Sequence, residues 1–309
     1  MIKPRLLKSG DRVAIVAPAS PFPPGEFEAG LAEIERLGFE PVFDRTVFDR
    51  KGYEAGSAET RARAISRALA DESVGAVIGV RGGYGSVHVL PLLDIAEVRR
   101  ARKAFIGYSD LTSLLTYFTG LCGLVAFHGP TVTGRLERGA EGYDQATLVG
   151  LLTRAEPLGE LAPPGLEVFR AGEAAGRLAG GNLALLAASL GTPYAFDPPD
   201  GCVLFLEDIN ERPYRLDRLW TQLLYGGIIR RASAIVFGEF PRCDEPGDEV
   251  RGRDTLTALT RDFPGPVLFG LPSGHTPGPA VTLPLGVRAR VVAGTGPAVV
   301  IEESAVSEE

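Results

Sequence analysis

Short apolar runs in the first half of the chain alternate with segments whose apolar residues recur at helical spacing. A short apolar run predicts a strand, and an apolar residue at every third or fourth position predicts an amphipathic helix. The predicted strands of this half cover residues 12–17, 41–43, 76–80, 104–108 and 124–128. The predicted helices cover residues 26–37, residues 58–70 after a cap at Ser57, and a stretch that begins near Leu111. This alternation favours a parallel sheet with helices on both faces.

The pattern loosens at residues 156–170, where two groups of turn-forming glycines and prolines occur. We predict a linker there, between an α/β domain at residues 1–155 and a second domain at residues 171–309. The second domain mixes predicted strands (202–206, 234–237, 267–269) with predicted helices (183–190, 216–225, 255–262). Three final apolar runs, 280–283, 287–292 and 298–301, predict antiparallel strands.

Charge and hydropathy exclude two classes of partner. The chain has 32 Lys and Arg against 39 Asp and Glu, a net charge of −7, and it has no basic run. A surface of this kind is poorly suited to the phosphate backbone, so we expect no nucleic-acid partner. No apolar run approaches the roughly 18 residues that cross a bilayer, so we expect no membrane partner.

The N-terminal segment and the cysteines both favour a cytoplasmic protein. Basic residues precede an apolar run at residues 13–17, as in a signal peptide, but that run has only five residues. A secretory signal needs roughly 7–15 apolar residues, so we predict a strand there. Cys122, Cys202 and Cys243 lie far apart and are odd in number, which is typical of reduced thiols in the cytosol.

Ser109 stands directly after a predicted strand and before a predicted helix. A serine at such a turn lies at the carboxyl edge of the sheet, where unpaired N–H groups favour developing negative charge. The Gly-x-Ser-Asp sequence is similar to the turn of a nucleophilic serine, without the second glycine of G-x-S-x-G. The alternative is that Ser109 or Asp110 only caps the helix.

The glycine-rich loop at residues 81–86 follows another predicted strand and should lie at the same sheet edge as Ser109. An N–H of this loop, from Gly82 or Gly83, could form an oxyanion hole with the N–H of Asp110. A phosphate site is less favoured, because neither G-x-G-x-x-G nor a Walker sequence is present. The alternative is a plain turn whose glycines adopt positive φ.

The chain has three histidines, and neither HExxH nor closely spaced Cys and His residues occur. We therefore expect no zinc site. His88 falls in a predicted helix and is expected to be structural, whereas His128 ends a strand at the active edge and could line a pocket. His275 lies in a loop rich in glycine and proline, which either fixes an imidazole in one pose or simply turns the chain.

Glu207 directly follows the predicted strand 202–206. A carboxylate at a strand end can accept a hydrogen bond from a histidine and fix its tautomer. Asp208 and Glu211 compete for this role, and Glu207 could also be a solvated loop acid.

Together these segments resemble the LD-carboxypeptidase family, the serine peptidase family S66 that includes muramoyltetrapeptide carboxypeptidase. The stretches that carry the resemblance are GDRVAIVAPAS (10–20), RGGYG (81–85), GYSD (107–110), HGP (128–130), GGNL (180–183), LEDINE (206–211) and GLPSGH (270–275). Each is short, but seven in this order are specific.

The resemblance implies a Ser109–His275–Glu207 triad, with Ser109 in the first domain and the other two residues in the second, so that the site would lie in an interdomain cleft. It implies a Rossmann-like or flavodoxin-like first domain and a second α/β domain with a small β-barrel-like core, usually as a cytoplasmic homodimer. It implies that no metal or cofactor is needed. The substrate would be a murein tetrapeptide that loses its terminal D-alanine, with Arg81, Tyr84 and His128 as binding residues. Arg81 could hold the free carboxylate, or it could form a structural ion pair.

Two alternatives remain. Relatives in the same family resemble microcin immunity proteins, which cleave an acylated nucleotide; the loop at residues 242–251 is where we expect such specificity to differ. The alternative from another class is a noncatalytic small-molecule-binding α/β protein in which Ser109 is a helix cap.

Overall fold

The computed structural model describes residues 1–247 and 249–308, and the chain divides into two compact units. The first unit holds Met1–Pro157, Gly278–Gly286 and the C-terminal segment from Ser304. The second unit holds Leu158–Pro277 and Val287–Glu303. The chain therefore returns to the first unit twice after it has entered the second.

The first unit contains a sheet of order β12-β5-β4-β3-β1-β2 among the residues described. Its strands are β1 (Arg12–Val16), β2 (Glu40–Val42), β3 (Val74–Gly79), β4 (Ala104–Gly107), β5 (Ala126–His128) and β12 (Leu283–Leu285). Neighbouring strands pair in parallel, except that β12 pairs antiparallel to β5. Pro284, which cannot donate to a ladder, stands in this edge strand, where proline is tolerated.

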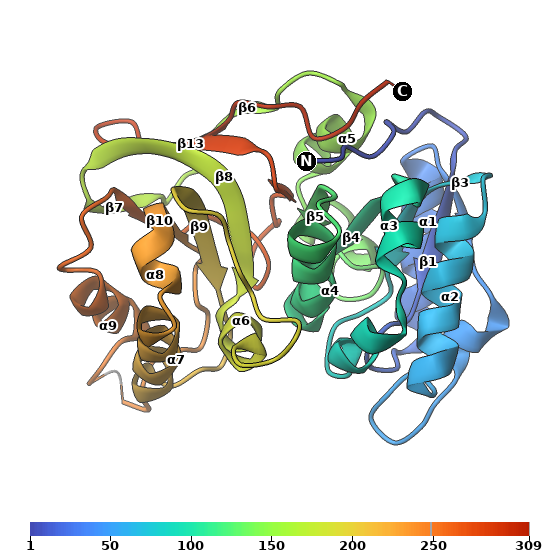
Figure 1. Cartoon of the computed structure of the whole chain (residues 1–309), viewed down its shortest axis with the longest axis horizontal. Helices are drawn as coiled ribbons and strands as arrows, with labels where there is room; N and C mark the ends of the chain where they lie inside the picture. Colours follow the sequence, from blue (N-terminus) through green and yellow to red (C-terminus); the bar gives the residue numbers. More distant parts are fainter. Residues whose placement is uncertain (248, 309) are drawn as a thin grey trace. The chain divides into compact units, whose positions relative to one another are not determined.

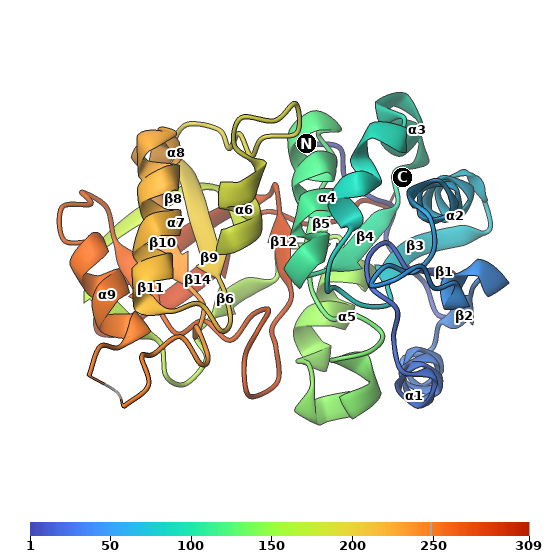
Figure 2. The ribbon, with the colours of Figure 1, turned by 90° about the horizontal axis from the view of Figure 1, so that it is seen from below.

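Helices cover both faces of this sheet, as the sequence predicts. Figure 2 shows α2, α3 and α4 along one face and α1 and α5 along the other. Their bounds are α1 (Pro24–Arg36), α2 (Ala58–Ala70), α3 (Ile95–Ala101), α4 (Thr112–Thr116) and α5 (Gln145–Thr153). Short 3₁₀ turns cover Arg45–Phe48, Ser86–His88, Leu90–Leu92, Ser109–Leu111 and Leu136–Glu141, and a π turn covers Tyr117–Leu121. The predicted cap of α2 is confirmed, because the Ser57 hydroxyl accepts from the Thr60 N–H at 3.2 Å.

The second unit contains a mixed sheet of order β6-β14-β13-β8-β9-β10-β11-β7, as far as the chain is described. Its strands are β6 (Gly159–Leu161), β7 (Glu167–Arg170), β8 (Gly172–Asn182), β9 (Cys202–Glu207), β10 (Ala232–Phe237), β11 (Val267–Phe269), β13 (Arg288–Ala293) and β14 (Ala298–Ile301). Its helices are α6 (Leu183–Ser189), α7 (Pro213–Tyr225), α8 (Ile228–Arg231) and α9 (Gly252–Leu259). Buried side chains of α6, α7 and α9 pack with those of β9, β10 and β11 in one apolar core that includes Trp220.

The division into units differs from the predicted domains, because residues 158–170 belong to the second unit and residues 278–286 and the segment from Ser304 belong to the first. Residues 156–170, predicted as a linker, contain β6 and β7, which are strands of the second sheet. The run at 280–283 was predicted to pair with the last two strands, whereas β12 joins β5 in the first unit, and β13 and β14 pair antiparallel as predicted. Pairing partners of short strands depend on tertiary contacts that a local pattern does not contain.

The long strand β8 was not predicted, because its sequence is rich in glycine and alanine, which are poor strand formers. Figure 1 shows β8 as a long curved strand of the second unit. A Cβ atom on Gly176 or Gly180 would collide with the carbonyl oxygens of Gly201 or Phe205. The glycines therefore let β8 approach β9 closely, and this approach brings Asn182 beside Glu207.

Candidate active site

Ser109 has an unusual backbone conformation at the carboxyl end of β4. Its φ is +63°, in the left-handed region that non-glycine residues avoid. Such a conformation costs on the order of 1–3 kcal/mol and occurs mainly at functional sites. The turn leads from a buried parallel strand through Ser109–Leu111 into α4, which is the geometry of a nucleophile elbow.

The alternative role of Ser109 as a helix cap is wrong. The N-cap positions of the Ser109–Leu111 turn and of α4 are Tyr108 and Leu111, so neither Ser109 nor Asp110 is a cap. Ser109 is only partly buried, which leaves its side chain within reach of a substrate.

The glycine-rich loop lies against Ser109, as the sheet-edge argument predicts. A Cβ atom on Gly82 would stand 2.9 Å from the Ser109 Cβ, 3.1 Å from its Oγ and 3.3 Å from the Asp110 nitrogen. Only glycine fits at this distance without displacing the serine. The backbone of Gly82 therefore lies beside both the hydroxyl and the Asp110 N–H.

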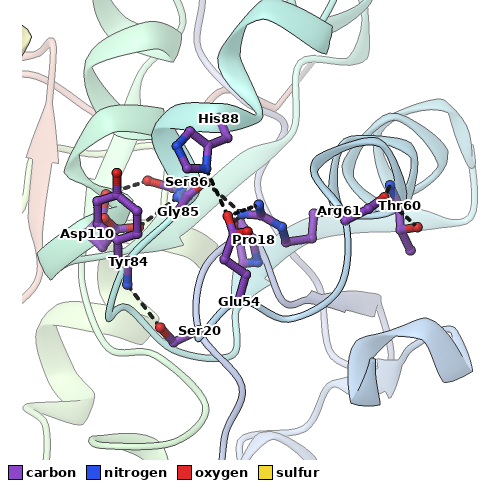
Figure 3. A network of polar contacts seen from close by, with 11 residues as sticks. Pro18, Ser20, Glu54, Thr60, Arg61, Tyr84, Gly85, Ser86, His88 and Asp110 are labelled. Atoms are coloured by element: carbon purple, nitrogen blue, oxygen red, sulfur yellow. Dashed lines mark hydrogen bonds and ion pairs between the residues drawn. The ribbon is translucent and has the colours of Figure 1, made fainter. Parts of the chain in front are cut away.

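Asp110 has a side-chain function that the sequence did not indicate. Its buried carboxylate accepts a hydrogen bond from the Ser86 N–H at 2.9 Å, and the Ser86 hydroxyl donates to the Asp110 carbonyl at 2.6 Å (Figure 3). Burial raises the pKa of Asp110, and the hydrogen bonds from Ser86 oppose this rise. These two hydrogen bonds, both donated by Ser86, fasten the end of the glycine-rich loop to the turn that carries Ser109.

The other first-unit residues in the predicted site have different environments. Arg81 is exposed and forms no ion pair with any residue that the structure describes, so the structural ion pair is not found. Tyr84 is also exposed. His128 is wholly buried at the end of β5, with its ring 6.2 Å from that of Tyr108. This position favours support of the Ser109 turn over the substrate contact predicted for His128.

His88 was expected to be structural within a helix. It ends the 3₁₀ turn Ser86–His88, and its side chain is half exposed. Its Nδ1 lies 2.8 Å from Glu54 Oε1 (Figure 3).

Glu207 and His275 form a direct pair in the second unit. Glu207 is the last residue of β9 and is fully buried. Its Oε2 lies 2.7 Å from His275 Nδ1 and accepts the His275 backbone N–H at 2.9 Å. A carboxylate can only accept, so the hydrogen of the neutral imidazole resides on Nδ1, and Nε2 is the nitrogen that carries no hydrogen in this tautomer.

This pairing decides between the three candidate acids. Asp208 accepts the N–H groups of Ala184 at 2.9 Å and Ile209 at 2.8 Å. Glu211 forms an ion pair with Arg215. Glu207 is thus the acid that holds His275, and the Gly/Pro loop of His275 does more than turn the chain.

Asn182 stands behind Glu207 and was not singled out as a site residue. Its side-chain amide donates to Glu207 Oε1 at 3.3 Å and to Asp208 Oδ1 at 3.0 Å. Its own oxygen accepts the Leu185 N–H at 3.2 Å and caps α6. The signal in the sequence was an asparagine between a glycine pair and a helix, a pattern typical of an N-cap.

Asp208 is a second buried carboxyl next to Glu207. Burial, together with the charge of Glu207, raises the pKa of Asp208 to about 7, although three N–H donors oppose the rise. The Gly238 backbone packs so closely that a Cβ there would stand 2.8 Å from the Glu207 Cβ. This close packing restricts the position of Glu207.

The structure also bears on metal ligands, thiols and membrane spans. Within residues 1–247 and 249–308, no group of three His, Cys, Asp or Glu side chains could hold a metal ion. The three cysteines are buried free thiols, and burial raises the pKa of Cys122 and Cys243 to about 12 and that of Cys202 to about 11. They are poor nucleophiles at neutral pH. None of the helices described is both long and apolar enough to cross a membrane.

In the predicted specificity loop 242–251, Arg242 donates to Asn210 at 2.7 Å and Glu245 pairs with Arg212 at 2.5 Å. Asp248 of this loop lies outside the described residues.

Comparison with known proteins identifies both halves of the chain. A model of the LD-carboxypeptidase N-terminal domain matches residues 13–129, and a model of the LD-carboxypeptidase C-terminal domain matches residues 175–291. The chain is 33% identical over 319 residues to a probable murein peptide carboxypeptidase of Bacillus subtilis (strain 168), covering 99% of this chain and 96% of that protein. It is 34% identical over 280 residues to the murein tetrapeptide carboxypeptidase of Pseudomonas aeruginosa, covering 85% and 88%.

Solved structures share the fold. The muramoyltetrapeptide carboxypeptidase from Oxalobacter formigenes matches with a TM-score of 0.82 and 30% identity, covering 94% of this chain and 99% of that one. MccF in complex with glutamyl sulfamoyl guanosine matches with a TM-score of 0.88 over 99% and 100% of the two chains. Its identity is 23%, so this second match speaks for the fold alone.

Proposed function

Because this chain belongs to the LD-carboxypeptidase family of peptidases, we propose that it removes the terminal D-alanine from murein tetrapeptides in peptidoglycan recycling. The bond cleaved is the peptide bond between an L-centred diamino acid and D-alanine. Ser109 is the nucleophile, His275 the general base and Glu207 the residue that orients His275.

The reaction has two halves. Nε2 of His275 takes the Ser109 proton as Oγ attacks the carbonyl carbon, and His275 then protonates the nitrogen of the leaving D-alanine. Water, activated by the same Nε2, releases the peptide from Ser109. Glu207 keeps the Nδ1 hydrogen in place and stabilises the imidazolium that forms in each half.

The observation that carries this proposal is the left-handed conformation of Ser109 at the end of β4. A packing role would not require a strained serine that is only partly buried. The proposal also requires Ser109 Oγ and His275 Nε2 to meet in the substrate complex.

The oxyanion of the tetrahedral intermediate would be bound by the N–H of Asp110 and an N–H of Gly82 or Gly83. Support comes from the closeness of Gly82 to both Ser109 and the Asp110 nitrogen. Donors fixed before the reaction stabilise the developing charge without having to reorganise.

Arg81 would bind the free carboxylate of the terminal D-alanine in a bidentate manner. Its exposure and its lack of an ion pair with the described residues support this role. Tyr84, exposed on the same loop, would contact the peptide.

We also propose that the protein is a cytoplasmic homodimer, as in the family. Analytical ultracentrifugation of the full chain tests the dimer.

The experiment incubates the protein with murein tetrapeptide, free and attached to muramic acid, and follows the products by mass spectrometry. We expect the release of one D-alanine, and no release with Ser109→Ala. A fluorophosphonate probe should label Ser109 in the wild type and fail to do so in His275→Ala. An intact tetrapeptide together with an unlabelled Ser109 would contradict the proposal and favour a noncatalytic binding protein.

A second candidate is a hydrolase of acylated nucleotides, because the chain is also 27% identical over 299 residues to the microcin C7 self-immunity protein MccF of Escherichia coli. Incubation with an aminoacyl sulfamoyl nucleoside separates the two candidates. Cleavage of that compound with an intact tetrapeptide would select the second.

A further inference from the structure

Arg61 of α2 is a buried cation that contacts three separate loops. Its Nη1 donates to the carbonyl oxygens of Pro18 at 2.6 Å and Gly85 at 2.7 Å, and its Nη2 lies 2.5 Å from Glu54 Oε1 (Figure 3). Its side chain is 1% exposed. Burying a guanidinium is costly unless its hydrogen bonds are well placed, so these contacts define a specific arrangement.

Both carbonyl partners of Arg61 belong to the surroundings of the glycine-rich loop. Gly85 ends the stretch that begins beside Ser109. Pro18 belongs to the loop after β1, in which the Ser20 N–H donates to the Gly82 carbonyl at 3.2 Å and the Ser20 hydroxyl accepts the Tyr84 N–H at 3.1 Å. Arg61 thus connects the loop after β1 to the glycine-rich loop, which contains Gly82 and Gly83.

Glu54 completes the arrangement. One oxygen of its carboxylate faces both Arg61 and His88. Burial raises the pKa of Glu54, but His88 and Arg61 outweigh this effect, so the pKa lies below its usual value. The ionised carboxylate balances the buried charge of Arg61 and fixes the orientation of its guanidinium.

We propose that Arg61 is a positioning residue that holds the Gly82–Gly83 backbone, through the carbonyls of Gly85 and Pro18, where its N–H groups meet the oxyanion. This inference rests on the proposed function, because it names the residue that fixes the backbone of the proposed oxyanion hole. Arg61 itself does not touch the substrate.

The test compares Arg61→Lys and Arg61→Met with the wild type in the tetrapeptide assay. A lysine keeps the charge but cannot reach the two carbonyls and the carboxylate together. Removing one oxyanion donor costs about 10²- to 10³-fold in kcat, and a displaced donor should cost less. We expect a fall of about 10- to 100-fold for Arg61→Lys, a larger fall for Arg61→Met, and a KM within about twofold of the wild type for both.

A binding readout separates positioning from general loss of structure. Calorimetry compares Ser109→Ala with the double variant Ser109→Ala/Arg61→Lys. The two should have the same Kd for the tetrapeptide, because the ground state does not use the oxyanion hole. The matched control is Arg36→Met. Arg36 is an arginine of α1 that pairs with Glu33 at 2.7 Å and has no contact with the glycine-rich loop among the described residues. The kcat of Arg36→Met should therefore equal that of the wild type.

Two results would overturn the inference. The first is a kcat of both Arg61 variants within twofold of the wild type. The second is loss of folded protein in both variants, since Arg61 would then serve the fold as a whole. Failure of the proposed function looks different, because the wild type would then neither release D-alanine nor react with the fluorophosphonate.

Discussion

Asp208→Asn should flatten the pH dependence of stability in the second unit. The pKa of Asp208 is raised from 3.8 to about 7 in the folded protein, by burial and by the charge of Glu207. Between these two values the folded chain retains a proton that the unfolded chain has released. The contribution of Asp208 to the stability of the wild type therefore falls as pH rises from about 4 to about 7, and levels off above it.

The magnitude follows from the shift. A rise from 3.8 to about 7 corresponds to about 4 kcal/mol, at 1.36 kcal/mol for each pH unit. Asparagine cannot ionise, so the variant lacks this decline. It has a pH-independent cost of its own, because its amide would face the Ala184 N–H that Asp208 now accepts.

The assay is urea denaturation followed by tryptophan fluorescence at several pH values. The chain has one tryptophan, Trp220, which is buried in the core of the second unit, so the signal reports the unit that contains Asp208. The difference in unfolding free energy, wild type minus variant, should decrease by about 4 kcal/mol from pH 4 to 7. Asp200→Asn, at a side chain that is 92% exposed, is the control and should give a flat difference. Parallel curves for wild type and Asp208→Asn would refute the reasoning and mean that the three N–H donors keep Asp208 ionised throughout.

Three further predictions concern turnover of the tetrapeptide. Glu207→Gln should lower kcat about 10³- to 10⁴-fold through loss of the His275 tautomer, whereas Glu211→Gln should change it by less than about threefold; the reverse order in steady-state assays would contradict the acid assignment. Gly82→Ala should lower kcat by about 10²-fold, because its Cβ would stand 2.9 Å from the Ser109 Cβ; fluorophosphonate labelling should slow in parallel. Arg81→Met should raise KM about 10- to 100-fold at unchanged kcat; an unchanged KM would remove Arg81 from substrate binding.

The sequence was sufficient for the parts of the site that follow from sheet geometry. Parallel strands end at one edge, so a loop after β3 and a serine after β4 had to be neighbours, and Gly82 does lie against Ser109. The pairing of Glu207 with His275 was predicted only through the family resemblance, because 68 residues separate them and no local pattern connects such distant positions.

The parts that were not predicted depend on contacts between distant segments. Helical spacing places Arg61 beside the apolar face of α2, and Arg63 and Arg67 away from it, but the partners of Arg61 become visible only with Pro18 and Gly85 in place. Asp110 was assigned a backbone N–H in the oxyanion hole or a helix cap, and its bond to Ser86 was missed because it crosses between two loops. The left-handed φ of Ser109 is likewise imposed by its neighbours, since the preferences of serine alone oppose it.

The return of the chain to its first unit has a consequence for synthesis on the ribosome. Strand β12 pairs with β5 through Leu283 and His128, and the Ser307 N–H donates to the Pro4 carbonyl. When residue 157 has emerged, the first sheet therefore still has an open edge, and the N-terminal residues lack a neighbour that is translated much later. A nascent chain in this state exposes an unpaired strand, which is a risk for aggregation. Truncation before residue 278 should leave the same edge open permanently, because the unit that carries Ser109 is completed only by residues that follow the second unit.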